Sequence, residues 1–503
     1  MAKPTFELPA HGDAPELELA KKAPKRADAY LIPVLKGEEG LELPGSALLD
    51  DAALRAVLEA LTAVGATGQP QEVTRVPAPE GVAAESIVAV GLGDPAELSD
   101  ETVRRAAGAS TRSLCGLDAV VTTLNDFGLA ATVEGAALGA YRFRGIRSEE
   151  AEASSLPVGR ITVIGDPKTD KDEFVAAQVT AESVLLARDL VNTPSSHLYP
   201  ASYAELLSSL GKEAGLDVEV LDEQALEKKG FGGILAVGRG SARAPRLVRL
   251  HWSPRKARRS VALVGKGITF DTGGISLKPA SKMEDMISDM GGSAAVAATV
   301  IAAARLNLPV KLVATIPLAE NMPSGEATRP GDVITHYGGI TSEIINTDAE
   351  GRIVLADALA RASEDKPDYL IEAATLTGAQ MVALGAKTSG VMGSEEFRDR
   401  VAEVGRSVGE PAWAMPLLEE QDEELKSPVA DIRNSHNSRN AGMLFAGLYL
   451  SRFIGEDIEW AHVDIAGPSF NNGGVSGYTP KRATGVPVRT FIALLNELAG
   501  QKK

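Results

Sequence analysis

The chain is organised around the heptapeptide Asn346-Thr347-Asp348-Ala349-Glu350-Gly351-Arg352, which stands directly ahead of an apolar run. Asp348 and Glu350 are two positions apart, so in an extended segment their side chains point to the same side. The run that follows, residues 353–360, has helical propensity, and its first turns would aim backbone N–H groups at whatever the acidic segment holds. The pattern predicts a metal site in a loop at a strand-to-helix junction.

A second cluster of charged residues lies upstream, in Gly265-Lys266-Gly267-Ile268-Thr269-Phe270-Asp271-Thr272-Gly273-Gly274. A strand expected at residues 261–264 leads into this glycine-rich loop, which Lys278 and Asp289 follow. Small residues there let the backbone approach a ligand. One pocket would then hold four carboxylates, which cannot all stay ionised in a desolvated site unless positive charge offsets them. Two lysines do not suffice if either is neutral, so we expect bound divalent cations.

Each acidic residue has a plain structural alternative when it is taken alone. Asp348 could cap the following helix and Glu350 could complete that cap, which is the better interpretation of an isolated Asp-x-Glu. Asp289, shortly before two glycines, could be a turn residue. The combination of these residues with Lys266 and Asp271 favours the metal site.

Other residues that suggest chemistry are interpreted structurally. His336, His436 and His462 form no His-x-x-x-His pair and do not adjoin the acidic motifs, so we expect structural or surface residues. The only cysteine, Cys115, is expected to be a small buried residue, and it excludes an intrachain disulfide. Gly91-Leu92-Gly93-Asp94 lacks the third glycine of a dinucleotide motif, which favours a strand-to-helix turn.

The heptapeptide and the spacing of Lys266, Asp271, Lys278 and Asp289 resemble the signature of the leucyl (cytosol) aminopeptidases, the two-metal peptidase family M17, including its bacterial PepA-like members. The resemblance covers roughly residues 189–503 and extends through Glu320-Asn321-Met322-Pro323-Ser324-Gly325, Thr375-Leu376-Thr377-Gly378-Ala379, Trp460-Ala461-His462-Val463-Asp464-Ile465-Ala466-Gly467 and Ala483-Thr484-Gly485. Upstream it is thinner and rests on pieces such as Glu134-Gly135-Ala136-Ala137-Leu138.

The resemblance implies a role for each metal ligand. Asp271 and Glu350 would contact both of two divalent ions, Lys266 and Asp289 would complete the tighter site, and Asp348 the more exchangeable one. Two such ions share and activate a water, whose hydroxide attacks the peptide carbonyl. The free amine of the substrate would bind one ion, which explains exopeptidase action.

The resemblance also assigns residues that are not ligands. Lys278, protonated, would stabilise the oxyanion, and Arg352 would hold a bicarbonate ion that shuttles protons. Met286 would line the recess for the first side chain of the substrate, although methionines are more often core residues. The remaining substrate contacts would come from Thr375, Leu376, Gly378 and Ala466.

These residues predict a metal-dependent aminopeptidase that releases N-terminal residues, leucine preferred, in intracellular peptide turnover. Carboxylate-rich sites accept manganese, zinc or magnesium, so the sequence does not select the metal. A phosphoesterase is disfavoured because phosphate sites seldom use lysine as a ligand. A DNA-binding role is disfavoured by the formal net charge of −17. The resemblance implies a homohexamer with its active sites facing an interior cavity.

The whole chain predicts a cytoplasmic α/β protein. It has 503 residues, 44% of them hydrophobic, which gives about two to four domains on length alone. No signal peptide is expected after Met1, and no apolar stretch reaches about 18 residues, so membrane insertion is not expected.

Alternation of apolar runs and helical patterns divides the chain into three parts. We predict a small α/β domain at 1–166, a connecting helix at 167–191, and a catalytic domain at 192–503. The catalytic domain would contain a mainly parallel, buried sheet flanked by helices. Its strands are expected at 233–237, 247–250, 261–264, 310–316, 369–373 and 461–465. The acidic loops follow the carboxyl ends of strands, where open α/β sheets place their sites.

Overall fold

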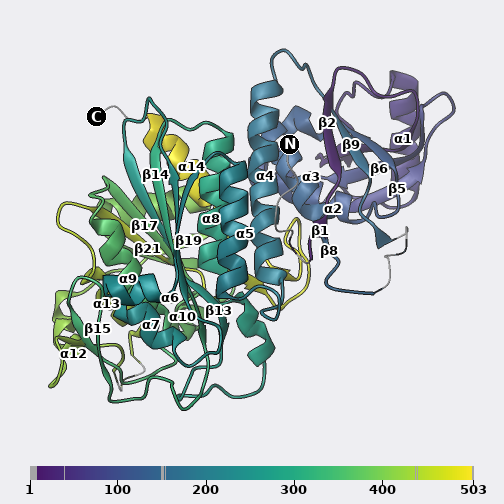
Figure 1. The fold of residues 1–503 in the computed structure, drawn as a ribbon. Coiled ribbons are helices and arrows are strands. Elements are labelled where there is room, and N and C mark those ends of the chain that lie inside the picture. The colour runs from purple at the N-terminus through teal and green to yellow at the C-terminus, as the bar shows by residue number, and fades with distance from the viewer. Residues whose placement is uncertain are drawn as a thin grey trace. The chain divides into compact units, whose positions relative to one another are not determined.

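The computed structural model describes residues 8, 10–38, 40–148, 152, 155–436, 438 and 440–500. They form two compact units, a smaller one of Ala10–Leu185 with Asn472–Lys481 and a larger one that is chiefly Leu186–Asn471 with Arg482–Lys503 (Figure 1). Both units are α/β, which confirms the predicted fold class. The domain limits drawn from the sequence, at residues 166 and 191, stay predictions.

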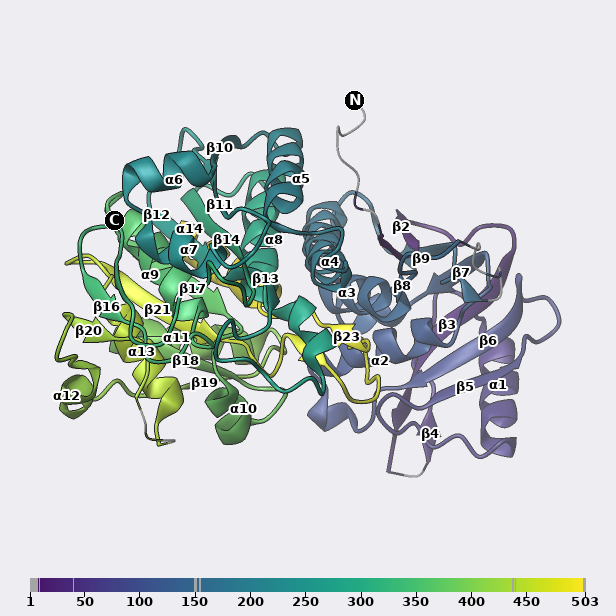
Figure 2. The same cartoon turned by 60° about the horizontal axis from the view of Figure 1, so that its bottom comes forward.

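The smaller unit is built on a mainly parallel sheet of strand order β2-β9-β7-β3-β6-β5 (Figure 2). Only the β5–β6 pair along this order is antiparallel in the described part, and β4 adds an antiparallel pairing to β3. The strands are β2 (Glu16–Ala20), β3 (Ala27–Lys36), β4 (Leu41–Glu42), β5 (Val73–Pro77), β6 (Ala84–Gly91), β7 (Ala119–Thr122) and β9 (Arg160–Ile164), with β1 (Gly12–Asp13) paired to β8 (Arg142–Phe143).

Helices cover both faces of this sheet because its strands alternate their buried side chains. Leu31 of β3 packs towards α2 (Asp100–Arg112) and α3 (Leu129–Ala140), whereas Ile32 packs towards α1 (Asp51–Ala63). Helices α2 and α3 approach closely, since a Cβ at Gly135 would stand 2.3 Å from the carbonyl oxygen of Arg104. Glycine is therefore required at that contact. Short 3-10 turns lie at η1 (Pro95–Glu97) and η2 (Leu124–Phe127).

Three predictions about the first 200 residues can be compared with the structure. The strand-to-helix turn predicted at Gly91 to Asp94 is present, since β6 ends at Gly91 and the short 3-10 helix η1 begins at Pro95. Most of the stretch predicted as a connecting helix, 167–191, is helical in α4 (Lys171–Asn192). Cys115 is only partly buried, and its sulfur accepts a hydrogen bond from the Arg142 guanidinium at 3.3 Å.

The larger unit contains a mixed sheet of strand order β10-β11-β14-β12-β17-β21-β18-β19, with β13 paired to β14. Its centre, from β14 to β21, is parallel, as predicted. The strands are β10 (Asp217–Leu221), β11 (Arg246–Trp252), β12 (Ser260–Gly265), β13 (Gly267–Asp271), β14 (Lys311–Asn321), β17 (Tyr369–Ala374), β18 (Ser389–Gly393), β19 (Ala412–Ala414) and β21 (Glu459–Asp464). Smaller pairings join β15 (Val333–Thr335), β16 (Thr341–Glu343) and β20 (Ile432–Arg433), and join β22 (Phe470–Asn471) to β23 (Arg482–Ala483).

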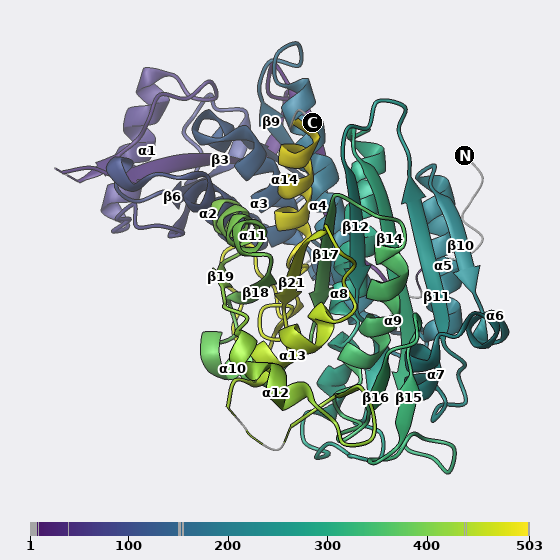
Figure 3. The same ribbon diagram turned by 90° about the vertical axis from the view of Figure 1, so that its left-hand side faces the viewer.

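Helices pack on both faces of this sheet too (Figure 3). One group comprises α5 (Pro200–Glu213), α8 (Gly291–Arg305), α11 (Glu395–Ser407) and α14 (Val488–Gly500). The other comprises α7 (Gly232–Gly238), α9 (Gly351–Ser363) and α13 (Gly442–Ser451), whose apolar residues share one core with the sheet. Shorter helices are α6 (Glu223–Lys229), η4 (Met283–Ser288), α10 (Gly378–Leu384), η5 (Glu419–Gln421) and α12 (Asp422–Leu425).

The structure corrects two local predictions. The apolar run 233–237 is not a strand but the helix α7, because a run of that length fits a buried helix as well as a buried strand. The segment expected as a glycine-rich loop after residue 264 is mostly the strand β13, which continues along β14.

One described segment, Met283–Arg305, is long and apolar enough to cross a membrane by length and composition. Of the 18 most apolar consecutive residues in this segment, 89% are buried inside the protein. Residues 291–304 of this segment are buried in α8, a core helix of the larger unit.

Candidate metal centre

The predicted site residues gather at the carboxyl ends of the central strands of the larger sheet. Lys266 stands between β12 and β13, Asp271 ends β13, and Thr375 follows β17. Since parallel strands end at the same edge of a sheet, their loops form one site there. The backbone of Lys266 is fixed on both sides, because its N–H donates to the Ala373 carbonyl at 3.0 Å and its carbonyl accepts from the Ser293 N–H at 2.8 Å.

Lys266 lies at the centre of the buried half of the site. Its Nζ is 2.8 Å from Oδ1 of Asp289 and 2.8 Å from Oε1 of Glu350. It also donates to the carbonyl oxygen of Thr375 at 2.9 Å, and the Thr375 hydroxyl donates to Asp289 Oδ1 at 2.7 Å. The lysine and both carboxyl groups are almost completely buried.

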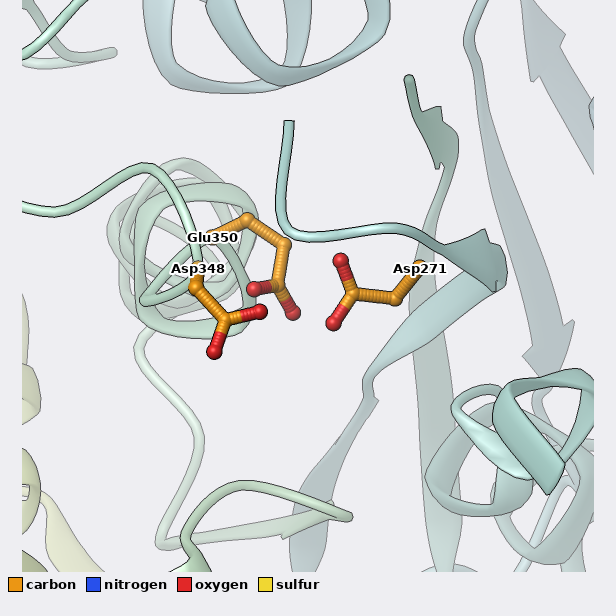
Figure 4. A group of neighbouring side chains, drawn as sticks. All are labelled: Asp271, Asp348 and Glu350. Carbon is orange, nitrogen blue, oxygen red and sulfur yellow. The ribbon is translucent and has the colours of Figure 1, made fainter. Parts of the chain in front are cut away.

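Three carboxylates point toward one another in the more open half (Figure 4). Asp271, Asp348 and Glu350 each offer an oxygen, and these oxygens all lie within 4.8 Å of one another. Lys278 pairs with two of them, at 2.7 Å from Asp271 Oδ2 and in contact with Asp348 Oδ1. The side chain of Lys278 is 22% exposed, so this ammonium group is accessible from outside.

Neighbouring polar groups fix the two acidic segments against each other. Asp271 Oδ1 accepts hydrogen bonds from the Gly273 N–H and from Asn321 Nδ2, both at 2.8 Å. The Thr347 hydroxyl donates to the Gly273 carbonyl at 2.6 Å. Gly273 has φ +87°, and a Cβ there would stand 2.8 Å from Asp348 Oδ1, so only glycine fits.

The heptapeptide brings its carboxylates together differently from the sequence expectation. Glu350 is not extended but has φ −74° and ψ −33° at the start of α9, so the chain already turns into the helix there. The Glu350 side chain makes no capping hydrogen bond, and its Oε1 contacts Lys266 instead. The capping alternative therefore does not describe Glu350.

Burial and mutual repulsion perturb the acidic groups. Burial, together with the nearby Glu350 carboxylate, raises the pKa of Asp271 to about 6. Burial raises the pKa of Asp289 well above its usual range and raises that of Asp348. Burial also acts to raise the pKa of Glu350, but Lys266 and Lys278 outweigh it and lower that pKa. These shifts indicate that the two lysines do not supply enough positive charge to keep every carboxylate ionised.

The donor set suits divalent cations. The buried Asp289 Oδ2 has no hydrogen-bond partner among the described residues, although its carboxyl group adjoins Lys266. A carboxylate oxygen left without a donor in a buried site is costly, and a cation would satisfy it. Carboxylates with one amine are hard to intermediate donors that suit manganese, magnesium or zinc.

The structure places Arg352 and Met286 outside these direct contacts. Arg352, on α9, is 8% exposed, donates to the Asn434 carbonyl at 2.8 Å and lies 5.6 Å from the ring centre of Phe445. No ion pair to Arg352 is found in the described part of the chain, and its Nε has no partner there. Met286 is partly buried in η4, three residues before Asp289.

The other predicted substrate contacts lie on two loops that Asp464 joins. Its Oδ1 accepts from the backbone N–H of Leu376 at 3.2 Å and of Ala466 at 3.1 Å. Gly378 is exposed at the first turn of α10, just after these residues. Among the predicted substrate contacts in the described part, only Thr375 forms hydrogen bonds with the Lys266 and Asp289 side chains.

The three histidines interpreted as structural or surface residues are largely enclosed by protein. His336 and His462 are buried, the first hydrogen-bonded to Asp357 at 3.0 Å and the second paired with Glu372. The side chain of His436 is 7% exposed. None of the three belongs to the acidic cluster.

Comparison with known proteins agrees with this architecture. The model of the cytosol aminopeptidase family, catalytic domain, matches residues 185–492, and that of the N-terminal domain of the same family matches residues 31–150. Proteins named probable cytosol aminopeptidase are similar over almost the whole chain. The one from Corynebacterium diphtheriae is 64% identical over 99% of each chain, and the one from Mycobacterium tuberculosis is 51% identical over 97% of this chain and 98% of its own.

A solved structure is similar as well. The bottromycin maturation enzyme BotP, also solved in complex with Mn, superposes with a TM-score of 0.84 at 36% identity, over 94% of this chain and all of its own. The fold and the site are those of a two-domain α/β enzyme with an acidic site at the carboxyl ends of its central strands. With both of its domains matched, the chain belongs to the cytosol aminopeptidase family, which makes it an aminopeptidase.

Sequence reasoning assigned no role to three residues that shape the site, Asn321, Thr347 and Asp464. Asn321 and Asp464 each end a central strand, β14 and β21, so their position was the signal that could have found them. Thr347 lies inside the heptapeptide itself.

Proposed function

We propose that the chain is a metal-dependent aminopeptidase that binds two divalent cations and releases N-terminal residues, leucine preferred, from peptides in intracellular peptide turnover. The observation that carries the proposal is the convergence of Asp271, Asp348 and Glu350 beside the buried pair of Lys266 and Asp289. Manganese, zinc or magnesium would fit these donors, and the Mn complex of the similar enzyme BotP supports the first.

Five side chains would hold the ions, namely Lys266, Asp271, Asp289, Asp348 and Glu350. When bound, the ions would supply the positive charge that lowers the pKa of a water and polarises the scissile carbonyl. Burial acts to lower the pKa of Lys266, but Asp289 and Glu350 outweigh it and raise that pKa. An amine binds a metal only through its lone pair, so Lys266 must give up a proton when an ion enters.

Lys278 has the opposite task. Burial acts to lower its pKa, but the carboxylates of Asp271 and Glu350 prevail and raise it, so Lys278 keeps its proton. Its partly exposed ammonium group can donate a hydrogen bond to negative charge that develops on a carbonyl oxygen. With the ions bound, the two lysines would therefore differ in protonation state and in role.

Arg352 would hold an anion, bicarbonate by the family resemblance. Burial lowers the pKa of its guanidinium, and no carboxylate pairs with it within the described residues. A buried cation in that condition favours an anionic partner.

Substrate contacts are proposed at Met286, Thr375, Leu376, Gly378 and Ala466. Thr375, Leu376 and Ala466 lie on the loops after β17 and β21, and Gly378 begins α10 just after the first of these loops.

The test is hydrolysis of leucine p-nitroanilide before and after dialysis against a chelator. Chelation should abolish turnover and Mn²⁺ or Zn²⁺ should restore it, because an uncompensated acidic pocket holds no activated water. The N-acetylated anilide should not be cleaved, since it lacks the free amine. Full activity of the metal-free protein, or cleavage of the blocked substrate at the same rate, would end the proposal.

The same preparation separates the alternatives. Turnover of bis(p-nitrophenyl) phosphate without peptidase activity would favour a phosphoesterase, and a gel shift at moderate salt would favour DNA binding. We also propose a cytoplasmic homohexamer, and sedimentation of a fully active monomer would contradict that assembly.

A further inference from the structure

Asp464 is a buried carboxylate that the proposed chemistry does not use. It ends β21, is fully buried and accepts three hydrogen bonds. Two come to Oδ1 from the backbone N–H groups of Leu376 and Ala466, and the third comes to Oδ2 from the Thr377 hydroxyl at 2.7 Å. A single side chain therefore connects the loop after β17 with the loop after β21.

A second buried side chain strengthens the same connection. Gln380, at the start of α10, accepts from the Gly467 N–H at 2.7 Å and donates to the Thr388 carbonyl at 2.6 Å. Its own N–H donates to the Thr377 hydroxyl oxygen at 3.0 Å, so the hydroxyl that reaches Asp464 also caps α10. The loop after β17 is thus held at neighbouring points.

The loop after β17 forms hydrogen bonds with the buried half of the metal centre through one residue, Thr375. Thr375 directly precedes Leu376, and its carbonyl accepts from Lys266 while its hydroxyl donates to Asp289. Among the described residues, Thr375 makes no hydrogen bond to Asp271 or Asp348. A shift of this loop would therefore disturb the ligands Lys266 and Asp289 and leave the open half in place.

Asp464 itself is not a ligand. Both of its oxygens are occupied by donors, and it does not belong to the cluster of Asp271, Asp348 and Glu350. Groups that orient metal ligands without touching the metal commonly affect its affinity.

We propose that Asp464 is a positioning residue, which holds Thr375 through Leu376 against Lys266 and Asp289 and so sets the affinity of one of the two cation sites. This inference rests on the proposed two-metal function. It predicts that a change at Asp464 lowers the affinity of one cation site and not of the other. A general loss of stability would affect both sites.

The experiment compares variants of the full-length protein by calorimetric titration with Mn²⁺. Asp464→Ala leaves two backbone N–H groups without an acceptor. The affinity for one Mn²⁺ ion should fall by a factor on the order of ten or more, while the other ion binds with its normal affinity. Asp464→Asn keeps an oxygen for Leu376 and Ala466 and should restore both ions to within about threefold of the wild type. The KM for leucine p-nitroanilide should rise in the alanine variant and recover in the asparagine variant.

Asp368 supplies a matched control at the opposite ends of the strands. Its Oδ2 accepts from the Ser260 N–H at 2.7 Å and from the Ser260 hydroxyl at 2.9 Å, which connects the starts of β12 and β17. Asp368→Ala should lower the melting temperature and leave both ions in place. Equal loss of an ion in this variant, or two ions bound normally by Asp464→Ala, would overturn the inference, as would failure of asparagine to rescue.

Hydrogen exchange separates this inference from the proposed function. In metal-free protein, Asp464→Ala should accelerate exchange in peptides that contain Leu376 and Ala466, whereas Thr377→Val, which retains both backbone bonds, should do so less. If the wild type bound no cation, the two-metal function would fail. Unchanged exchange in Asp464→Ala would refute the positioning role by itself.

Discussion

Replacing Gly351 by alanine tests whether the position of Lys266 matters independently of stability. Gly351 is the first residue of α9, and a Cβ there would stand 2.6 Å from Cε and 2.7 Å from Nζ of Lys266. Ordinary contact begins at 3.4 Å, so the lysine must move by about 0.8 Å. Its Nζ is already fixed between Asp289, Glu350 and the Thr375 carbonyl, so this movement breaks site contacts.

The expected magnitude follows from that displacement. A misplacement of about 1 Å in a site can cost up to about 100-fold in rate, so kcat/KM should fall by about 10- to 100-fold, or about 1.4–2.7 kcal/mol. Stability should fall less than activity, because the atoms that must shift are the end of a side chain and not backbone, and because alanine is favoured over glycine in helices by up to about 1 kcal/mol. We therefore expect a loss of activity that exceeds the loss of stability.

The assay is hydrolysis of leucine p-nitroanilide with added Mn²⁺, accompanied by thermal unfolding. Gly442→Ala is the matched control, since Gly442 also begins a helix, α13, but its Cβ would stand at an ordinary 3.4 Å from the Ala379 Cβ. The control should keep its activity. A Gly351→Ala enzyme with kcat/KM within about twofold of the wild type would refute the reasoning.

Two further predictions concern the metal centre. Lys266→Met should reduce metal content toward one ion per subunit, whereas Lys278→Met should retain both ions and lose kcat by a factor on the order of 100, as for loss of an oxyanion donor. Metal analysis with kinetics checks this, and two fully retained ions in the first variant or a lost ion in the second would reverse the roles. Because the pKa of Asp271 is raised to about 6, the metal-free protein holds an extra proton that the unfolded chain has lost, and its stability should fall as pH rises from about 4 to about 6. A cation must displace that proton, so the Mn²⁺-induced rise in melting temperature should grow over the same range, and a constant rise would contradict the assignment.

The sequence predicted the fold class well because alternation of apolar runs and helical patterns is a strong signal over long segments. The central parallel strands, and the placement of acidic loops at their carboxyl ends, followed from the same pattern. The run 233–237 failed because its length and composition fit either element, and only packing against α9 and β14 makes it the helix α7.

Within the site, the sequence predicted which residues meet but not how. Asp348 and Glu350 converge because the chain turns into α9 between them, not because they share one face of an extended segment. The Asp464 connection depends on hydrogen bonds between residues 87 or more positions apart, which no local pattern encodes. The roles of the individual ligands stay predictions.

The smaller unit is not one continuous piece of chain, and this has a practical consequence. Its last segment, Asn472–Lys481, lies nearly 300 residues after Leu185 in the sequence. Within the unit, the Tyr478 hydroxyl donates to the Glu101 carboxylate at 3.0 Å, and Tyr478 packs against Gly108 of α2. A protein truncated after residue 185 would therefore expose the surface of α2 that residues 472–481 cover within this unit. A stable isolated unit would need these ten residues attached through a linker.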